Sequence, residues 1–372
     1  MATFFPVNPN AAVIVRRDTG TLVNASDGTL ADLNDTIGDS FSGGLLGDHF
    51  VAGDSNDTLN GSAGADTMRG SGGNDTYVYD SSSDIEGDVI DGGAGFDALW
   101  TIATVGAGAY DFTTATFAGS SGAAIEQLNF LNFTTQNVIF NASQFGGAGI
   151  AGALAILGNV GTETVTINNA SNFSAASFTF SFWDAATDRI VINGTTSFDI
   201  ITGSGQRDTI SGGLGADLII GSAGADRHEG GGGNDVLRYA SQAEIDNDTI
   251  DGGADVDELR TSAGVGTYDF RTATFSGSSG AAVDRLNIFN NTTQNVIFNA
   301  SQFGGAGIAV TLAIVGDASG TETVTINNAS TFSAAGFTFS SWSSATDSIA
   351  INGTTGADSI TGSSQRDTIS GG

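Results

Sequence analysis

Residues 203–238 read GSGQRDTIS, GGLGADLII, GSAGADRHE and GGGGNDVLR, four consecutive units of nine residues. Each unit begins with Gly, has Asp at its sixth place and keeps one larger residue at its eighth place. These positions are Asp208, Asp217, Asp226 and Asp235, and Ile210, Ile219, His228 and Leu237. A preceding run, residues 194–202, continues in the same phase with Asp199. A fixed period of this kind predicts a repeat architecture in which each unit is one small structural module.

The residue types in each unit predict a metal-binding turn followed by a short strand. Glycines allow the backbone to take positive φ and to turn tightly. The Asp that follows them provides a hard carboxylate oxygen, and the loop carbonyls provide further oxygens, which suits Ca²⁺ with its about six to eight oxygen ligands. The last three residues place one apolar side chain between two outward ones, as in a short strand. The alternative is a flexible Gly/Ser/Asp-rich linker, which we expect for the metal-free state only.

The same register occurs three times along the chain. It runs clearly from residue 43 to residue 78, is interrupted by four residues, and resumes in two further units with Asp88 and Asp97. The second array follows the same plan, with Asp248 and Asp257 after its interruption, and a third opens at residue 353. The predicted domains are a lead-in at 1–34, arrays at 35–100 and 194–260, spacers at 101–193 and 261–352, and the start of a truncated third array at 353–372.

The two spacers resemble each other closely. The sequence TTQNVIFNASQFGGAGIA occurs at residues 134–151 and again at residues 292–309, which indicates a tandem duplication of a unit of about 160 residues. Short apolar strands are expected in the first spacer at residues 128–130, 138–140, 154–156, 165–167, 178–180 and 190–192. Their spacing predicts coils of a parallel β-solenoid, with a compact β-sandwich as the alternative. The expected fold class is therefore all-β, with β-roll arrays alternating with solenoid-like spacers.

Composition excludes several functions. The net charge is −30, from 41 acidic and 11 basic residues, and every basic residue is Arg. Such a chain repels nucleic acid and anionic membranes and attracts divalent cations. Cysteine is absent, so disulfides and thiolate metal sites are excluded. No apolar run reaches transmembrane length, and the amino terminus lacks the pattern of a cleaved secretory signal.

The sequence gives no sign of an enzyme active site. The two histidines, His49 and His228, both lie inside repeats. His228-Glu229 is followed by glycines, so the zinc-protease helix motif is missing, and a phosphate-binding loop lysine is impossible without Lys. We therefore predict a protein that is not an enzyme.

The arrays resemble the calcium-binding β-roll of RTX (repeats-in-toxin) proteins, with hemolysin-type nonapeptide repeats. That resemblance implies a roll with a pair of nonapeptides per turn and Ca²⁺ held between loops two units apart. The implied Asp pairs are Asp48 with Asp66, Asp57 with Asp75, Asp199 with Asp217, Asp208 with Asp226, and Asp217 with Asp235. Asp88, Asp97, Asp248 and Asp257 follow the interruption and have no assigned partner, whereas Asp358 and Asp367 have no later unit with which to pair. The glycines implied in the metal loops are Gly61, Gly64, Gly70, Gly72, Gly73, Gly92, Gly93, Gly95, Gly212, Gly213, Gly215, Gly221, Gly224, Gly230, Gly231 and Gly233.

Some units depart from the pattern. The fourth-place Gly is replaced by Leu46, Ser55, Ser197, Gln206 and Gln365, which is expected to weaken those loops. His228 takes a place that is apolar elsewhere, and we expect it to be tolerated near an array edge or bend rather than to bind metal. Arg207 and Arg366 precede the Asp of their loops, where each replaces lost positive charge or is simply solvated.

The resemblance also implies location and function. It predicts a secreted or cell-surface protein that leaves a bacterium by a one-step (type I) route and folds on extracellular Ca²⁺. The chain stops inside a repeat, so a carboxy-terminal secretion signal is not visible and a fragment is expected. The alternatives are a structural or adhesive surface module that binds itself or a cell-surface ligand, and a non-catalytic part of a larger secreted toxin or hydrolase.

Overall fold

The computed structural model describes the backbone of three short strands near the amino terminus and most of the chain after them. The described ranges are 12–14, 22–24, 29–31, 38–102, 108–131, 135–262, 266–289, 293–317 and 320–372. Every regular element within them is a β-strand or a three-residue 3-10 turn, and the strands pair in parallel, so the predicted all-β parallel class is confirmed. The chain divides into two compact units, Met1–Asn168 with Ser177–Arg189, and Asn169–Ala176 with Ile190–Gly372.

The first unit is built from parallel sheets. One contains β1 (Ala12–Ile14), β3 (Thr29–Ala31), β5 (His49–Val51), β7 (Thr67–Arg69), β9 (Val89–Asp91) and β12 (Thr116–Phe117). Another contains β2 (Leu22–Asn24), β4 (Ser40–Ser42), β6 (Thr58–Asn60), β8 (Thr76–Tyr79), β10 (Ala98–Ile102), β13 (Ile125–Leu131), β15 (Ile150–Leu157) and β18 (Thr179–Ser181). A third group contains β11 (Gly108–Asp111), β14 (Gln136–Asn141) and β16 (Glu163–Asn168), and the 3-10 turns are η1 (Ser82–Asp84) and η2 (Ala142–Gln144).

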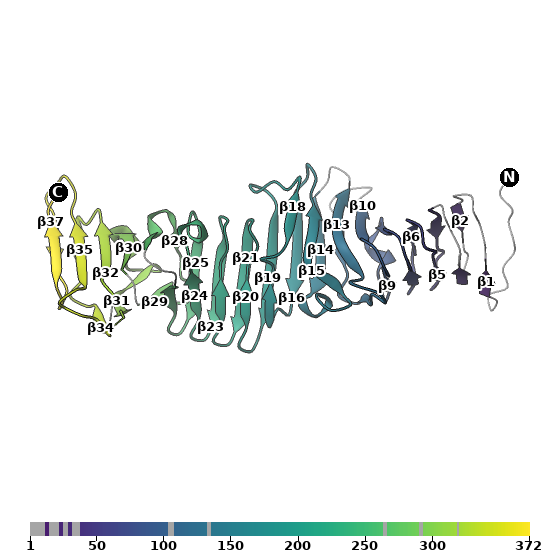
Figure 1. Cartoon of the computed structure of the whole chain (residues 1–372). Helices are drawn as coiled ribbons and strands as arrows, with labels where there is room; N and C mark the ends of the chain where they lie inside the picture. The colour runs from purple at the N-terminus through teal and green to yellow at the C-terminus, as the bar shows by residue number, and fades with distance from the viewer. Residues whose placement is uncertain are drawn as a thin grey trace. The chain divides into compact units, whose positions relative to one another are not determined.

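Successive strands of the first array alternate between two sheets. From β4 to β10 each strand pairs with the strand two places later, as Phe41 does with Leu59 and Leu59 with Tyr77. Two nonapeptides therefore make one coil, and the coils stack into a β-roll, as the labelled strands β5, β6, β9 and β10 indicate (Figure 1). This winding confirms the predicted β-solenoid.

The second unit is wound in the same way. One sheet contains β17 (Asn172–Ser174), β20 (Ile200–Thr202), β22 (Leu218–Ile220), β24 (Val236–Tyr239), β26 (Glu258–Thr261), β29 (Val283–Ile288), β31 (Ile308–Val315) and β34 (Thr338–Ser340). A second sheet contains β19 (Arg189–Thr195), β21 (Asp208–Leu214), β23 (Arg227–Gly232), β25 (Thr249–Ala254) and β28 (Thr274–Phe275). Other strands are β27 (Gly266–Asp269), β30 (Gln294–Asn299), β32 (Glu322–Asn327), β35 (Ser348–Asn352), β37 (Asp367–Ser370), β33 (Thr331–Ser333) and β36 (Ser359–Thr361), with turns η3 (Gln242–Glu244), η4 (Phe270–Thr272) and η5 (Ala300–Gln302).

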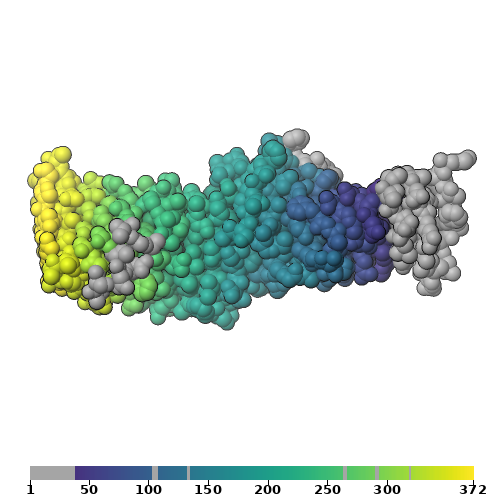
Figure 2. Space-filling view, in the orientation of Figure 1, coloured from purple at the N-terminus to yellow at the C-terminus, as the bar shows by residue number. Residues whose placement is uncertain are grey.

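The core of each array is the eighth place of its repeats. In three-residue strands such as β5 and β6 the middle residue is buried and its neighbours are partly exposed, as the sequence pattern predicts. Phe50, Leu59 and Met68 in the first unit are at most 1% exposed, and so are Ile210 and Ile219 in the second. Each such side chain contributes about 1.5–3 kcal/mol by leaving water. Neighbouring coils within each unit are packed in contact along the visible face (Figure 2).

The spacers continue this parallel winding with longer coils. Leu99 pairs with Leu128, and Leu128 pairs with Ile156, all in parallel strands. A sandwich would require two antiparallel sheets, so that alternative is wrong for the described residues. The stacked rings of Phe112 and Phe140, with centroids 5.4 Å apart, fill the wider interior. Most of the predicted lead-in, residues 1–34, lies outside the described residues, and the predicted domain boundaries stay a prediction.

Candidate metal sites of the repeat arrays

The aspartates of the repeats are joined across coils by a repeated hydrogen bond. The backbone N–H of each Asp donates to Oδ1 of the Asp one coil later, for example from Asp48 to Asp66 at 2.6 Å. All five Asp pairs implied by the resemblance are brought together in this way. The other four are Asp57 with Asp75, Asp199 with Asp217, Asp208 with Asp226, and Asp217 with Asp235, each at 2.8 Å.

The aspartates after each four-residue interruption join the same column. Asp66 donates to Asp88 and Asp75 to Asp97, each at 2.8 Å. In the second unit Asp226 donates to Asp248 at 2.9 Å and Asp235 to Asp257 at 3.0 Å. The structure therefore supplies partners that the sequence left unassigned.

Three further carboxylates belong to the column and were missed by the sequence analysis. Asp39 donates from its backbone to Asp57, Asp97 donates to Glu126 Oε2 at 2.7 Å, and Asp257 donates to Asp284 Oδ2 at 3.2 Å. Each of the three acids precedes a buried apolar residue by two positions, as in Glu126-Gln127-Leu128 and Asp284-Arg285-Leu286. That spacing is the signal that could have found them without the glycines.

The first-place glycines leave room for these carboxylates. A Cβ on Gly61 would lie 2.2 Å from Asp66 Oδ2, and a Cβ on Gly70 would lie 2.0 Å from Asp75 Oδ2. Gly73 has φ of +104°, where a side chain would be strained and would also meet the Ser55 carbonyl oxygen at 2.1 Å. The recurring glycines of the repeat are thus explained by the close approach of backbone to carboxylate and to the neighbouring coil.

The second carboxylate oxygen divides the aspartates into two groups. Buried Oδ2 atoms without a hydrogen-bond partner belong to Asp66, Asp75, Asp97, Asp217, Asp226, Asp235, Asp248 and Asp257. In contrast, Oδ2 of Asp199 accepts from the Thr195 N–H at 2.6 Å, and Oδ2 of Asp208 accepts from the Ser204 N–H at 2.6 Å. The first group has buried acceptors that fit a cation, because a buried polar atom without a partner is costly.

Burial raises the pKa values of this first group. It raises the pKa of Asp75 and of Asp248 to about 8, that of Asp257 to about 7, and that of Asp66 and of Asp217 to about 6. Charges of neighbouring aspartates in the column add to the effect of burial. Without a cation, the ionised column is therefore unfavourable near neutral pH.

In four units a hydroxyl at the second place bonds to the Asp of its own loop. Thr195 Oγ1 donates to Asp199 Oδ1, and Ser204 Oγ donates to Asp208 Oδ1, each at 2.9 Å. Thr354 and Ser363 do the same for Asp358 and Asp367, at 2.6 and 2.8 Å. Asp358 and Asp367 accept backbone hydrogen bonds from Thr354 and Ser363 in their own loops, and both residues are only half-buried. These loops satisfy their Asp internally, and three of them, those with Ser197, Gln206 and Gln365, also lack the fourth-place Gly.

The two arginines of these loops remain at the surface. Arg366 Nη1 donates to the Ala345 carbonyl at 3.3 Å and is exposed, and Arg207 is partly exposed. The bond of Arg366 is made to backbone rather than to an aspartate, which favours the solvated interpretation for that residue.

Each spacer holds a buried acid pair that the sequence did not indicate. The Glu163 N–H donates to Asp188 Oδ1 at 3.0 Å, and the Glu322 N–H donates to Asp347 Oδ1 at 3.2 Å. All four side chains are 0% exposed. The carboxylate oxygens of both glutamates are buried without a hydrogen-bond partner. Burial and the neighbouring Asp raise the pKa of Glu163 to about 7.

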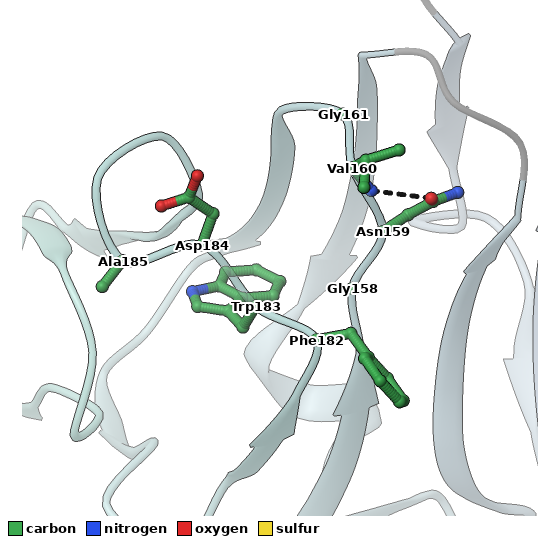
Figure 3. A pocket seen from close by; sticks show the side chains of 8 residues that line it. All are labelled: Gly158, Asn159, Val160, Gly161, Phe182, Trp183, Asp184 and Ala185. Carbon is green, nitrogen blue, oxygen red and sulfur yellow. Dashed lines mark hydrogen bonds between the residues drawn. The ribbon is translucent and has the colours of Figure 1, made fainter.

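A shallow pocket lies beside the first of these pairs and is separate from the Asp columns. It is lined by the stretches 158–161 and 182–185, with the Trp183 indole between them (Figure 3). Val160 is 76% exposed and Phe182 83% exposed, and the Asn159 amide oxygen accepts from the Val160 N–H at 2.7 Å. None of the predicted metal residues lines it.

Among the residues that the structure describes, no helix has the length and apolar character needed to cross a membrane. A family model described as the RTX calcium-binding nonapeptide repeat (4 copies) matches residues 42–77, 191–219, 202–237, 242–268 and 350–372, and that family binds Ca²⁺. A comparison with curated proteins finds no match.

Proposed function

Because the chain carries RTX calcium-binding nonapeptide repeats, we propose that it is a secreted calcium-binding protein whose arrays fold when Ca²⁺ binds outside the cell. The observation that carries this proposal is the set of buried Asp Oδ2 atoms without hydrogen-bond partners. RTX repeats are typical of extracellular proteins, which supports the location, and a type I bacterial route is part of the proposal.

The donor chemistry of the loops favours calcium. The free atoms are carboxylate oxygens, and glycine-rich loops bring backbone carbonyls near them; Gly70, for example, lies close to both Asp75 Oδ2 and the Gly92 carbonyl. Ca²⁺ accepts such an all-oxygen set with flexible geometry, whereas Mg²⁺ demands a tighter octahedron. The ligands we propose are the column aspartates with unpartnered Oδ2 atoms, led by Asp75, Asp97, Asp235 and Asp257.

The coupling of folding to Ca²⁺ follows from the negative charge of the column aspartates. Column aspartates lie one coil apart along each array, and their backbone hydrogen bonds to one another exist only in the wound chain. Without a cation the buried carboxylates repel one another, and a site that does not exist in the unfolded chain adds its binding free energy to folding. We propose that the arrays are the calcium-responsive domains and that the spacers carry no catalytic role.

A structural or adhesive role is the second candidate. The exposed Val160 and Phe182 beside the Trp183 pocket favour it, because apolar side chains grouped at a surface often mark a contact. The partner would be a second copy of the chain or a cell-surface ligand. Self-association that depends on Ca²⁺ and is lost in Phe182→Ser would support it, and a monomer at all calcium concentrations would count against self-association.

The test is a calcium titration of the whole chain followed by far-UV circular dichroism, with Mg²⁺ as the control ion. We expect a cooperative gain of β-structure with Ca²⁺ and little response to Mg²⁺. The variant Asp75→Asn/Asp235→Asn should shift the midpoint to higher Ca²⁺, whereas Asp358→Asn/Asp367→Asn should leave it near that of the wild type. A spectrum that is unchanged by both EDTA and Ca²⁺ would reject the proposal.

A further inference from the structure

His228 lies at the centre of a sheet and not at an array edge. Its strand β23 pairs with β21 on one side and β25 on the other, and the side chain is 1% exposed. The residue 160 positions earlier is Met68, which lies in β7 and is also 1% exposed. An apolar side chain therefore fills the corresponding place in the first unit, and packing alone does not require an imidazole.

This histidine and two buried aspartates bring their ligand atoms close together. Asp226, His228 and Asp248 each offer one ligand atom, and these atoms all lie within 4.8 Å of one another. His228 Nδ1 is 3.8 Å from Asp248 Oδ2. The three residues are 2%, 1% and 0% exposed, so the cluster lies in the interior of the second unit.

The donor atoms are held in place and left available. Asp226 Oδ1 accepts from the Asp208 N–H, and Asp248 Oδ1 accepts from the Asp226 N–H, which fixes both carboxylates. The Oδ2 atoms of both aspartates and Nε2 of His228 are buried without a hydrogen-bond partner. Three buried lone-pair donors without partners in one cluster are costly, and a bound metal ion that accepts their lone pairs would satisfy them.

Comparison with the first unit shows what the histidine changes. There the Tyr79 hydroxyl donates to Asp88 Oδ2 at 2.8 Å. In the second unit the equivalent hydroxyl, Tyr239, contacts His228 Nδ1 at 2.8 Å, and Asp248 Oδ2 loses its partner. Replacement of Met by His thus both adds a nitrogen donor and frees a carboxylate oxygen.

The backbone makes room for the imidazole. A Cβ on Gly221 would lie 2.8 Å from His228 Cε1 and 3.1 Å from Nε2. At the equivalent Gly61 the nearest atom is Asp66 Oδ2. The space that holds a carboxylate in the first unit therefore holds the histidine ring in the second.

We propose that Asp226, His228 and Asp248 form a buried site for a divalent transition-metal ion such as Zn²⁺ or Co²⁺, bound by one imidazole nitrogen and two carboxylate oxygens. Mixed imidazole and carboxylate donors suit these ions, whereas Ca²⁺ takes oxygen ligands. The site differs from the proposed calcium loops in its donor chemistry. Asp226 and Asp248 belong to the same column, but beside His228 we assign their Oδ2 atoms to the transition metal and not to Ca²⁺.

The first test compares the whole wild-type chain with His228→Met in buffer containing saturating Ca²⁺. This substitution restores the residue type that the first unit already buries at Met68, so the fold should persist. Titration with Co²⁺, followed by calorimetry and visible absorption, should show one site in the wild type whose affinity falls about tenfold or more in the variant. Equal Co²⁺ affinity in the two proteins would overturn the proposal.

A second measurement needs no variant and decides the matter if His228→Met fails to fold. The chain has two histidines, so imidazole nitrogen resonances of the ¹⁵N-labelled wild type report on each separately. One equivalent of Zn²⁺ should shift the His228 resonances and leave those of His49 unchanged. A shift confined to His49, or no shift at all, would reject the site.

Discussion

The backbone N–H of Asp75 donates a 2.8 Å hydrogen bond to Asp97 Oδ1, although 22 positions separate the two residues instead of the 18 that separate Asp57 from Asp75. The additional residues form the turn η1, which lies outside the column. Asp235 and Asp257 repeat this relationship across the turn η3. The carboxylate column therefore passes through the insertion without a break, and Asp75, Asp97, Asp235 and Asp257 on its two sides each have an Oδ2 atom without a hydrogen-bond partner.

Asp97→Asn should change stability in opposite directions with and without calcium. The amide keeps an oxygen to accept the Asp75 N–H but removes a buried negative charge. In EDTA we expect the variant to gain about 1–3 kcal/mol, because an uncompensated buried charge is lost. In Ca²⁺ it should be less stable than the wild type, because a ligand is lost. Thermal melts in both buffers measure this.

The matched control for that experiment is Asp358→Asn. Asp358 is half-buried and accepts hydrogen bonds from Thr354 in its own loop. Its substitution should leave the calcium-induced gain in melting temperature unchanged. If Asp97→Asn and Asp358→Asn behaved alike, the unpartnered column oxygens would have no special role.

The metal-free protein should become less stable as pH rises. Burial raises the folded-state pKa of Asp75 from 3.8 to about 8 and that of Asp66 to about 6, so the folded state binds protons more tightly than the unfolded state. This contribution is fully present below about pH 4 and is lost as pH rises through the folded-state values of about 6 to 8. Denaturant unfolding in EDTA from pH 4 to pH 9 measures how the free energy of unfolding changes with pH.

With saturating Ca²⁺ the free energy of unfolding should instead increase with pH, because protons compete with the ion for the carboxylates. A metal-free stability that increased with pH would contradict this assignment.

Gly70→Ala should destabilise the first array. The new Cβ would lie 2.0 Å from Asp75 Oδ2 and 2.5 Å from the Gly92 carbonyl oxygen, and the second of these atoms belongs to the backbone of the next coil. Overpacking of this kind costs about 2 kcal/mol or more, and it should also weaken calcium binding. Gly205→Ala is the control, because nothing lies within 4 Å of a Cβ built there. Chemical unfolding should separate the two, and equal stabilities would show that the close approach at Gly70 is relaxed in solution.

Much of the fold could be predicted from the sequence because each nine-residue unit repeats the same residue types at the same places. Glycine, aspartate and a buried residue recur at fixed places, so the coil and its core follow from the period, whereas pairs such as Asp57 with Asp75 were implied by the resemblance to RTX proteins. The period does not show which Asp is satisfied by its own loop, since that depends on whether a hydroxyl such as that of Thr195 or Ser204 reaches the carboxylate. Glu126 and Asp284 lie outside the nine-residue period and become visible only when longer coils return them to the column.

The spacers hold the clearest case of a residue that sequence could not identify. Glu163 follows a turn in an ordinary alternating strand, and its partner Asp188 lies a coil away. Only the parallel stacking brings the two acids together in the interior. The same stacking joins Glu322 to Asp347 in the second unit, which makes the pair a property of the coil rather than an accident of one loop.

Glu163→Gln should stabilise the metal-free protein at high pH and have little effect at low pH. Burial, together with Asp188, raises the pKa of Glu163 from 4.5 to about 7, so its carboxyl is neutral in acid and ionised in base. The neutral amide avoids that buried charge, and its advantage should grow as pH rises from about 4.5 through about 7. Each kcal/mol gained should raise the melting temperature by about 2–4 °C. Melts in EDTA near pH 5 and near pH 9 measure the difference, with the exposed Glu86→Gln as control. A gain of equal size at both pH values, or a loss at the higher one, would show that the Glu163–Asp188 pair is already compensated in solution.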